Sequence, residues 1–576
     1  MLLKIAGAYR NPGIMGSKGL LTPASHDHEP HDPGQKGVSM IQDGKIWVGS
    51  TAGRVPAILL PRMANRHGLI AGSTGSGKTI TLKGLAESFS GMGVPVFLAD
   101  VKGDLAGMCQ PGAAGGSITS RLEAIGAAAD ESFFQGFPVT FWDLFGKKGI
   151  QLRTTVSEMG PLLLARVLGL NDLQSDILNV VFQIADAEGL LLIDTKDLKA
   201  MLNYVSDNRS AYEADYGKIS PASLAVIIRS LSSLEGVGGD IFFGEPALNI
   251  TDWFTTDANG KGMIHILDSE SLIQNGQLYS TFLLWLLSEL FEQLPEVGDL
   301  EKPRMVFFFD EAHLLFRGAS QTLLDKIAQV IKLIRSKGVG IFFCTQDPSD
   351  IPDEVLAQLG NKIQHTLHAY TPKDQKAVKA AAQSFRVNPE MDTYQTIMEL
   401  GVGEAVCSFL DEAGVPGMAQ KITVAPPQSL MGPITDDVRQ RVINESLLSV
   451  RYRNAADPDS AYEFLQRKGL RDAEEAQKKA AEEAKAKEEA KAEAAAAKAK
   501  AKEEEKAEKA RKKEEEARAR SVRNAAKSVS STVAGTLGRE VGKNLGGSMF
   551  GKFGKTMGGN VGASLGRGII GTLFKK

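Results

Sequence analysis

Short apolar runs alternate with amphipathic stretches from about residue 57 to residue 427. The apolar runs predict buried strands, and the stretches between them have the apolar spacing of helices. Such alternation is typical of an α/β domain whose mostly parallel sheet is covered by helices on both faces. The predicted strands are residues 68–71, 94–99, 139–142, 263–267, 305–309, 340–344, 362–367 and 404–409.

The regions around these strands have other patterns. Residues 1–56 are rich in Gly, Pro, His and Asp, and they predict a loop-rich segment with a short strand near residues 45–48. Residues 157–234 have helical spacing almost throughout, which predicts a helical insertion within the α/β domain of residues 57–427. Residues 428–470 predict a helical extension.

The C-terminal part changes character twice. Residues 471–526 consist almost entirely of Ala, Glu, Lys and Arg, which predicts a long solvated helix with Glu–Lys pairs four residues apart. Leu is nearly absent, so the helix is a rigid spacer or a weakly self-associating coiled-coil stalk. Residues 527–576 are basic and have glycines every fourth residue, a spacing that lets two helices approach closely. This tail is either a membrane-surface or self-association element, or a flexible segment.

Composition and charge limit the kinds of site and the cellular compartment that the sequence allows. A hydrophobic content of 43% supports sizeable cores, and the formal net charge of −3 requires any nucleic-acid surface to be local. The three cysteines form no CxxC pair, so neither a zinc site nor a disulfide framework is indicated. Lys4 and Arg10 interrupt the N-terminal apolar run, which makes a secretory signal a poor fit. The sequence therefore predicts a cytoplasmic protein.

A complete phosphate-binding motif follows the predicted strand of residues 68–71 and precedes a helical run. Its glycines let backbone N–H groups wrap the phosphates of ATP, and the helix N-terminus adds partial positive charge. The lysine would reach the β- and γ-phosphates, and the threonine hydroxyl would bind Mg²⁺. The residues of this predicted ATP site are Gly72, Ser73, Thr74, Gly75, Ser76, Gly77, Lys78 and Thr79.

An acidic pair ends the apolar strand of residues 305–309. Asp310 would hold Mg²⁺ through water, and Glu311 would polarise the attacking water as a general base. Such a pair is common at strand ends, but together with the phosphate loop it indicates a hydrolytic motor rather than a GTPase-type switch. Thr345 and Gln346 follow the apolar run of residues 340–344. Gln346 would contact the γ-phosphate or the attacking water, or would simply cap the strand.

The ordered series of motifs resembles the HerA/FtsK group of DNA-pumping ATPases, most nearly the bacterial HerA-like proteins of the YjgR type. The resemblance spans residues 57–423. Besides the phosphate loop it rests on Arg66-His-Gly-Leu-Ile, Asp100-Val-Lys-Gly-Asp104, Asp310-Glu-Ala-His313, Arg335-Ser-Lys-Gly-Val-Gly, Thr345-Gln346 and Val355-Leu-Ala-Gln358-Leu-Gly-Asn361-Lys362.

This resemblance implies a RecA-like fold in a homo-hexameric ring, with ATP at each subunit boundary and DNA in the central channel. It also implies that Arg66 or Arg335 acts from a neighbouring subunit on the γ-phosphate, and that Asp100 lies near the nucleotide or at the subunit boundary. Each residue has a plainer alternative. Arg66 can be an exposed loop residue, Arg335 a cation at a helix C-terminus, and Asp100 the cap of a turn.

Two functions remain open on the sequence. The first is a ring-shaped, Mg²⁺-dependent DNA translocase or helicase driven by ATP. The second is an ATPase that assembles or remodels a protein partner, bound through the N-terminal segment or the C-terminal tail, in solution or at a membrane surface. The motif series favours the first function, whereas the near-neutral charge favours the second.

Overall fold

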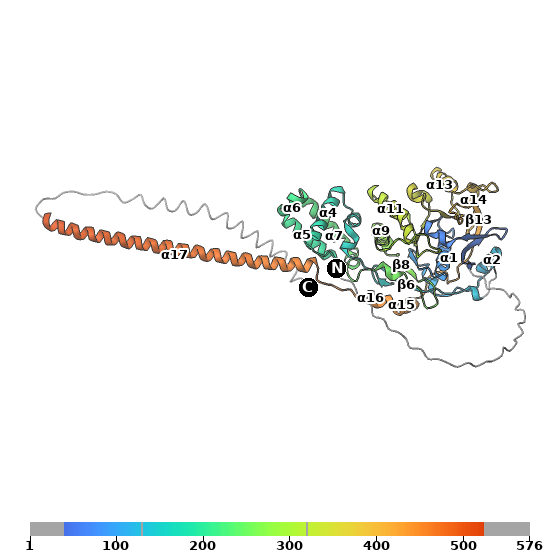
Figure 1. Cartoon of the computed structure of the whole chain (residues 1–576), viewed down its shortest axis with the longest axis horizontal. Helices are drawn as coiled ribbons and strands as arrows, with labels where there is room; N and C mark the ends of the chain where they lie inside the picture. The colour runs from blue at the N-terminus through green and yellow to red at the C-terminus, as the bar shows by residue number, and fades with distance from the viewer. Residues whose placement is uncertain (1–39, 128–130, 318, 320, 524–576) are drawn as a thin grey trace, which may run out of the picture. The chain divides into compact units, whose positions relative to one another are not determined.

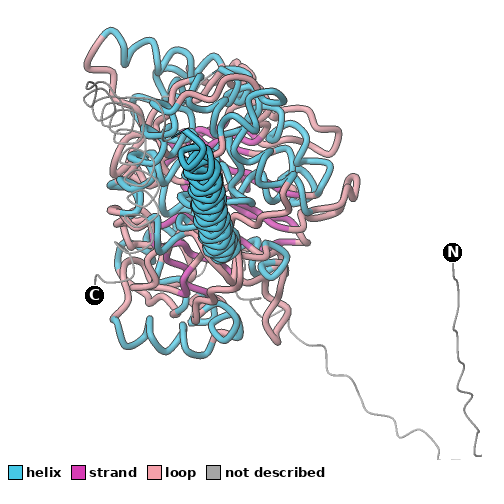
Figure 2. The backbone as a smooth tube through the Cα atoms, turned by 90° about the vertical axis from the view of Figure 1, so that its left-hand side faces the viewer, coloured by secondary structure: helices cyan, strands magenta, loops and turns pink. Residues whose placement is uncertain are grey.

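A single sheet with a parallel half and an antiparallel half organises the protein. The computed structural model describes residues 40–523 except 128–130, 318 and 320, and these residues contain a 13-stranded sheet. The strand order is β1-β2-β13-β12-β11-β4-β10-β9-β5-β8-β6-β7, with β3 paired to β2. The strands lie inside, with helices and loops around them (Figure 2).

The parallel half carries the long apolar runs of the sequence. It consists of β4 (Gly68–Ala71), β5 (Val96–Asp100), β6 (Val139–Asp143), β7 (Ile150–Gln151), β8 (Ile264–Asp268), β9 (Met305–Phe309), β10 (Val339–Thr345) and β11 (Asn361–Gln364). Every residue of β4, β5, β6, β8, β9 and β10 is buried, because helices cover both faces of a parallel sheet.

The predicted strands appear within a few residues of their expected bounds, and the α/β fold class is confirmed. The sheet differs from the expectation beyond β11, where the pairing becomes antiparallel. This half contains β1 (Ile41–Gln42), β2 (Lys45–Ser50), β3 (Pro56–Leu59), β12 (Glu404–Ser408) and β13 (Gln420–Val424). The sequence reading missed β13, and part of the segment predicted to be loop-rich belongs to the sheet.

Helices of the predicted insertion gather in one region, where α4, α5, α6 and α7 lie together (Figure 1). Capping boxes start three helices of this region, with N-cap side chains from Thr155, Asn171 and Asp194. Helices α1 to α8 are α1 (Lys78–Gly91), α2 (Gly116–Ile125), α3 (Val156–Val167), α4 (Asp172–Ala187), α5 (Thr195–Asp207), α6 (Arg209–Tyr216), α7 (Pro221–Glu235) and α8 (Gly239–Phe242). The later helices are α9 (Gly276–Gln293), α10 (His313–Phe316), α11 (Gln321–Ile334), α12 (Asp353–Leu356), α13 (Pro372–Gln383), α14 (Thr393–Glu399), α15 (Asp436–Glu445), α16 (Leu447–Tyr452) and α17 (Ala461–Arg523).

The long charged helix predicted from composition is α17, which has 63 residues. The described residues divide into two units after Arg471, so most of α17 belongs to the second unit. Lys487 pairs with Glu483 at 3.6 Å and Lys512 with Glu508 at 3.0 Å, each four residues apart. The Gly-rich tail lies outside the described residues, and no helix within them is long and apolar enough to cross a membrane.

A cavity of about 260 Å³ lies between α3, α9 and α11. It is lined mainly by apolar side chains, but it also contains the carboxylates of Glu158 and Glu289. Burial, followed by the nearby Glu158, raises the pKa of Glu289 to about 7, although Gln293 donates a hydrogen bond to it. The charged form of Glu289 is therefore disfavoured in the folded protein.

We expect Glu289→Gln to raise the free energy of unfolding at pH 8. A raised folded-state pKa means that the stability present below about pH 4.5 is lost as the pH rises through about 7. Since one pKa unit corresponds to about 1.4 kcal/mol, and since solvent in the cavity screens this charge, the gain should be about 1–2 kcal/mol. Urea unfolding at pH 8 and pH 4.5 measures it. The gain should shrink at pH 4.5, and Glu296→Gln, at an exposed residue outside the cavity, should show none; equal gains at both pH values would contradict the titration.

Candidate functional site

Three predicted motifs meet because of the strand order. The phosphate loop follows β4, the acidic pair follows β9, and Gln346 follows β10, which lies between β4 and β9. Parallel strands have their carboxyl ends at one edge of the sheet, where open α/β sheets bind ligands. The motifs therefore line one cavity of about 480 Å³.

The phosphate loop has the backbone geometry of an anion-binding turn. Gly77 has a φ of 111° and is the N-cap of α1, with no side chain capping the helix, so the first N–H groups of α1 face the loop. Gly72 has a φ of 151°, and a Cβ there would lie 2.6 Å from the Cβ of His365. The side-chain oxygens of Ser73 and Ser76 are buried without a hydrogen-bond partner among the described residues, as donors to phosphate would be.

Lys78 is positioned by the loop itself. Its Nζ donates hydrogen bonds to the carbonyl oxygens of Gly72 and Ser73, the latter at 2.9 Å. Burial lowers the pKa of Lys78, while the nearby Asp310 and Glu311 oppose that shift. The ammonium therefore lies between the loop and the acidic pair, where it can neutralise phosphate charge.

His365 supports the loop from β11, and the sequence reading missed it. Its Nε2 lies 2.8 Å from the Thr81 hydroxyl, and its Nδ1 lies 2.8 Å from the carbonyl oxygen of Glu404. Burial lowers the pKa of His365 to about 4, so the ring is neutral at pH 7. His365 lies within the predicted strand of residues 362–367, and its local sequence does not mark it as a residue of the site.

Burial and hydrogen bonds fix the position of the acidic pair, Asp310 and Glu311. Burial, and then the charge of Glu311, raises the pKa of Asp310 to about 6. Tyr279 donates its hydroxyl to the carbonyl oxygen of Asp310 at 2.9 Å, and the N–H of Glu311 donates to Asp310 Oδ1 at 2.9 Å. Glu311 itself has a φ of 48°, a left-handed conformation that is unusual for a residue with a side chain.

Two side chains hold the Glu311 carboxylate. His313 Nδ1 lies 3.3 Å from one oxygen, and Gln346 Nε2 donates to the other at 3.0 Å. The adjacent His313, followed by the hydrogen bond from Gln346, lowers the pKa of Glu311, and Glu311 in turn raises the pKa of His313. Glu311 is thus kept ionised, which is the state that a general base requires.

Gln346 also reaches the phosphate loop. Thr74 donates its hydroxyl to Gln346 Oε1 at 3.3 Å, so one amide side chain connects Thr74 with Glu311. This bridge fits the predicted role at the γ-phosphate better than the capping of a strand. That role stays a prediction.

Asp100 ends β5 and caps the turn that follows it. Its carboxylate accepts hydrogen bonds from the N–H groups of Lys102, Gly103 and Leu105, at 3.3, 2.8 and 3.0 Å. It is not among the residues that line the cavity, whereas Lys102 and Asp104 are. Asp100 therefore shapes the turn that carries two lining residues, which corresponds to the alternative of a strand-end cap.

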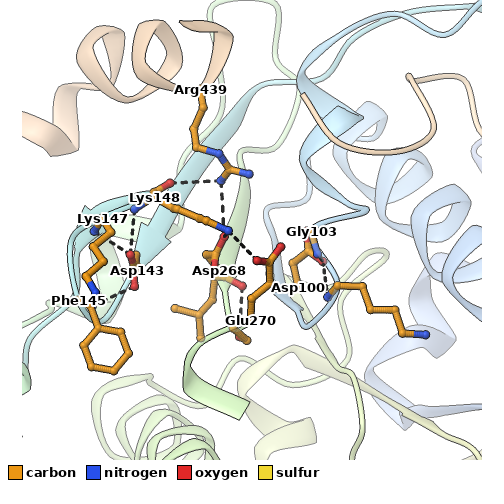
Figure 3. Close-up of polar contacts among 12 residues, drawn as sticks. Asp100, Gly103, Asp143, Phe145, Lys147, Lys148, Asp268, Glu270 and Arg439 are labelled. Carbon is orange, nitrogen blue, oxygen red and sulfur yellow. Dashed lines mark hydrogen bonds and ion pairs between the residues drawn. The ribbon is translucent and has the colours of Figure 1, made fainter. Parts of the chain in front are cut away.

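A charged network lies behind this turn (Figure 3). Glu270 packs against Gly103 and accepts a hydrogen bond from Lys148 at 2.6 Å. Asp268 lies 3.7 Å from Lys148 Nζ and 3.9 Å from a guanidinium nitrogen of Arg439 on α15. The network connects the turn after Asp100 to the loop after β6 through Lys148, and to α15 of the helical extension through Arg439.

The two candidate arginine fingers lie at the amino ends of the parallel strands, opposite the phosphate loop. Arg66 ends the short helix that precedes β4, and Arg335 begins the short helix that precedes β10. Strand β4 alone spans about 13 Å, so its amino end is remote from the phosphate loop. Arg335 lies 3.6 Å from Asp299, and the Arg66 guanidinium lies beside Gly414. The structure does not bring either arginine to this chain's own phosphate loop.

Seven residues that line the cavity were not predicted from the sequence. The additional lining residues are Ile80, Lys83, Lys102, Asp104, Val402, Met431 and Gly432. Lys102 and Asp104 lie inside a quoted motif and could have been found. Val402 and Met431 come from distant loops, and nothing in their local sequence marks them.

The family profile described as "Helicase HerA-like C-terminal" matches residues 47–556. The chain belongs to this family. A probable helicase of Methanocaldococcus jannaschii is 30% identical over 145 residues, which are 24% of this chain and 26% of that protein. The match thus spans about a quarter of the relative's length.

Solved structures with similarity to this HerA-like chain include two further proteins. The bacterial conjugative coupling protein TrwB is 14% identical, with a TM-score of 0.46 over 68% of this chain and 90% of TrwB. VirB4 of Thermoanaerobacter pseudethanolicus is 15% identical, with a TM-score of 0.44 over 67% of this chain and 98% of VirB4.

We expect Gln346→Ala to lower ATP turnover about 10²-fold, because Glu311 loses a donor that orients it. The affinity for ADP should change less than about threefold, since the phosphate loop keeps its own contacts. Steady-state hydrolysis and calorimetric ADP binding separate these effects. Gln375→Ala, on exposed α13, is the matched control. Unchanged turnover in Gln346→Ala would show that Gln346 has no role in hydrolysis.

Proposed function

We propose that this chain is a Mg²⁺-dependent ATPase motor that moves DNA as a ring-shaped translocase or helicase. The observation that supports it most is the arrangement around Glu311. An ionised carboxylate lies in the same cavity as the phosphate-loop lysine and is oriented by His313 and Gln346. A nucleotide-binding protein that did not hydrolyse would have no use for such a base.

Each residue has a role in this proposal. The N–H groups of residues 72–79 and Lys78 bind the phosphates, and Glu311 orients and deprotonates the attacking water. The Thr79 hydroxyl and Asp310 both line the cavity and would hold Mg²⁺, which neutralises the charge that develops on the phosphoryl oxygens. Oxygen ligands of this kind are those that Mg²⁺ prefers.

The ring is supported by the position of the arginines. Arg66 and Arg335 lie at the edge of the sheet away from the phosphate loop, so either could reach a γ-phosphate only in a neighbouring copy. An arginine delivered in this way would stabilise transition-state charge and would make hydrolysis depend on assembly.

The first test is ATP hydrolysis with and without linear duplex DNA at low and moderate salt, with Lys78→Ala as the blank. A DNA motor should hydrolyse ATP faster on DNA, and the stimulation should fall steeply as salt rises, because phosphate contacts release counterions. Hydrolysis that DNA leaves unchanged would contradict the DNA motor. It would instead favour an ATPase that remodels a protein partner, and removal of residues 528–576 would then test the tail.

A second test addresses the base. We expect Glu311→Gln to bind ATP with little change and to lower turnover by about 10³-fold or more, because the amide keeps the shape but cannot accept the proton. Single-turnover hydrolysis and equilibrium ATP binding measure the two quantities. Glu354→Gln, on exposed α12, should behave as the unaltered protein. Retained turnover in Glu311→Gln would exclude Glu311 as the base.

A further inference from the structure

The segment of residues 428–432, here called the strap, crosses helix α1 directly beside the nucleotide cavity. Lys83 and Glu87 lie four residues apart on α1, and each is only 1% exposed. Lys83 donates from Nζ to the carbonyl oxygen of Leu430. Glu87 accepts hydrogen bonds from the N–H groups of Gln428 at 2.7 Å and Ser429 at 3.3 Å, and from the Ser429 hydroxyl.

The strap is also fixed from its other side. Leu430 donates its N–H to the carbonyl oxygen of Gln110 at 2.9 Å, and Gly107 packs against the carbonyl groups of Leu430 and Gly432. Two buried charges and this close backbone packing therefore determine where the next residue lies. That residue is Met431, whose side chain lines the cavity and remains 43% exposed.

A second apolar side chain enters the cavity from the turn before β12. Gly403 donates its N–H to the carbonyl oxygen of Ser76 at 3.0 Å, and Arg121 donates to the carbonyl oxygen of Val402 at 3.1 Å. This turn is thus attached to the phosphate loop. Val402 lines the cavity and is 69% exposed, so its aliphatic surface is open to a ligand.

Val402 borders the phosphate loop, whereas Met431 lies farther along α1, beyond the phosphate end of the cavity. Lys83, which holds the strap, is five residues after Lys78 along α1, a rise of about 7.5 Å. Lys78, Thr79, Asp310 and Glu311 supply the charged end, whereas Val402 and Met431 supply aliphatic surface. Ligand cavities combine apolar walls with a few polar groups in this way, and the flat face of a nucleobase is the apolar part of a nucleotide.

The geometry points to a nucleobase subsite formed by Val402 and Met431, in which the strap fixes the position of Met431 over the base. The inference rests on the proposed nucleotide function and specifies the part of the ligand that the motifs do not assign. The phosphates are held by charge and backbone N–H groups, and the base is held by burial between two aliphatic side chains.

The test compares two ligands that share a diphosphate and differ in the nucleoside. Calorimetry on the full chain measures the affinities of ADP and inorganic pyrophosphate, each with Mg²⁺. We expect Val402→Ala and Met431→Ala each to weaken ADP binding about tenfold, because each removes apolar surface from the base. Pyrophosphate affinity should stay within about twofold. Met431→Leu, which nearly conserves volume, should keep most of the ADP affinity.

Matched controls exist outside the cavity. Val387→Ala and Met418→Ala remove the same groups from side chains that are 76% and 53% exposed, and both should leave ADP binding unchanged. ADP affinity that survives Val402→Ala and Met431→Ala would overturn the subsite, and so would an equal loss of pyrophosphate binding. Unaltered protein that binds pyrophosphate as tightly as ADP would also overturn it but leave the ATPase proposal standing. Protein that binds neither ligand, like Lys78→Ala, would overturn both.

Discussion

The register of β10 between β4 and β9 is the constraint on which the site depends. Phe343 of β10 is paired with Phe309 of β9, and Thr345 is paired with Ala71 of β4. All three strands therefore end within about two residues of the same level, and the next residues of each emerge at one edge. A shift of one residue would turn every side chain to the other face of the sheet.

Aromatic packing stabilises that register. Phe308 and Phe342 stack with their ring centroids 5.1 Å apart, and Phe89 of α1 contacts both rings at 6.5 and 6.2 Å. The phosphate-loop helix is thus packed on the same two strands that deliver the acidic pair and Gln346. Such aromatic pairs add to the burial of apolar area. At the strand ends, the local environment moves the pKa of Asp310 up and that of Glu311 down, which separates the roles of two adjacent carboxyl groups.

The sequence was informative wherever the signal is local. The phosphate loop is a contiguous motif, and the apolar runs that became β4 and β9 were predicted with their observed bounds. Strand β12 and part of β2 were predicted, but the antiparallel pairing was not, because β13 is short and only partly buried, and its pairing with β2 joins residues far apart in the chain. His365, Val402 and Met431 were missed for the same reason: each reaches the site through tertiary packing, and none stands in a motif.

The predicted division between an ATPase domain ending at residue 427 and a helical extension beginning at residue 428 crosses the site itself. Lys83 and Glu87 are buried charges, and buried charges are costly unless they are paired and hydrogen-bonded. Their hydrogen-bond partners include backbone groups of residues 428–430, just beyond the predicted division. Because α1 begins at the phosphate loop, any displacement of the strap leaves buried charged groups on this helix without their hydrogen-bond partners. The same chain continues into α15, where Arg439 joins the network behind the Lys102 turn. The extension is therefore connected to the surroundings of the cavity at two points.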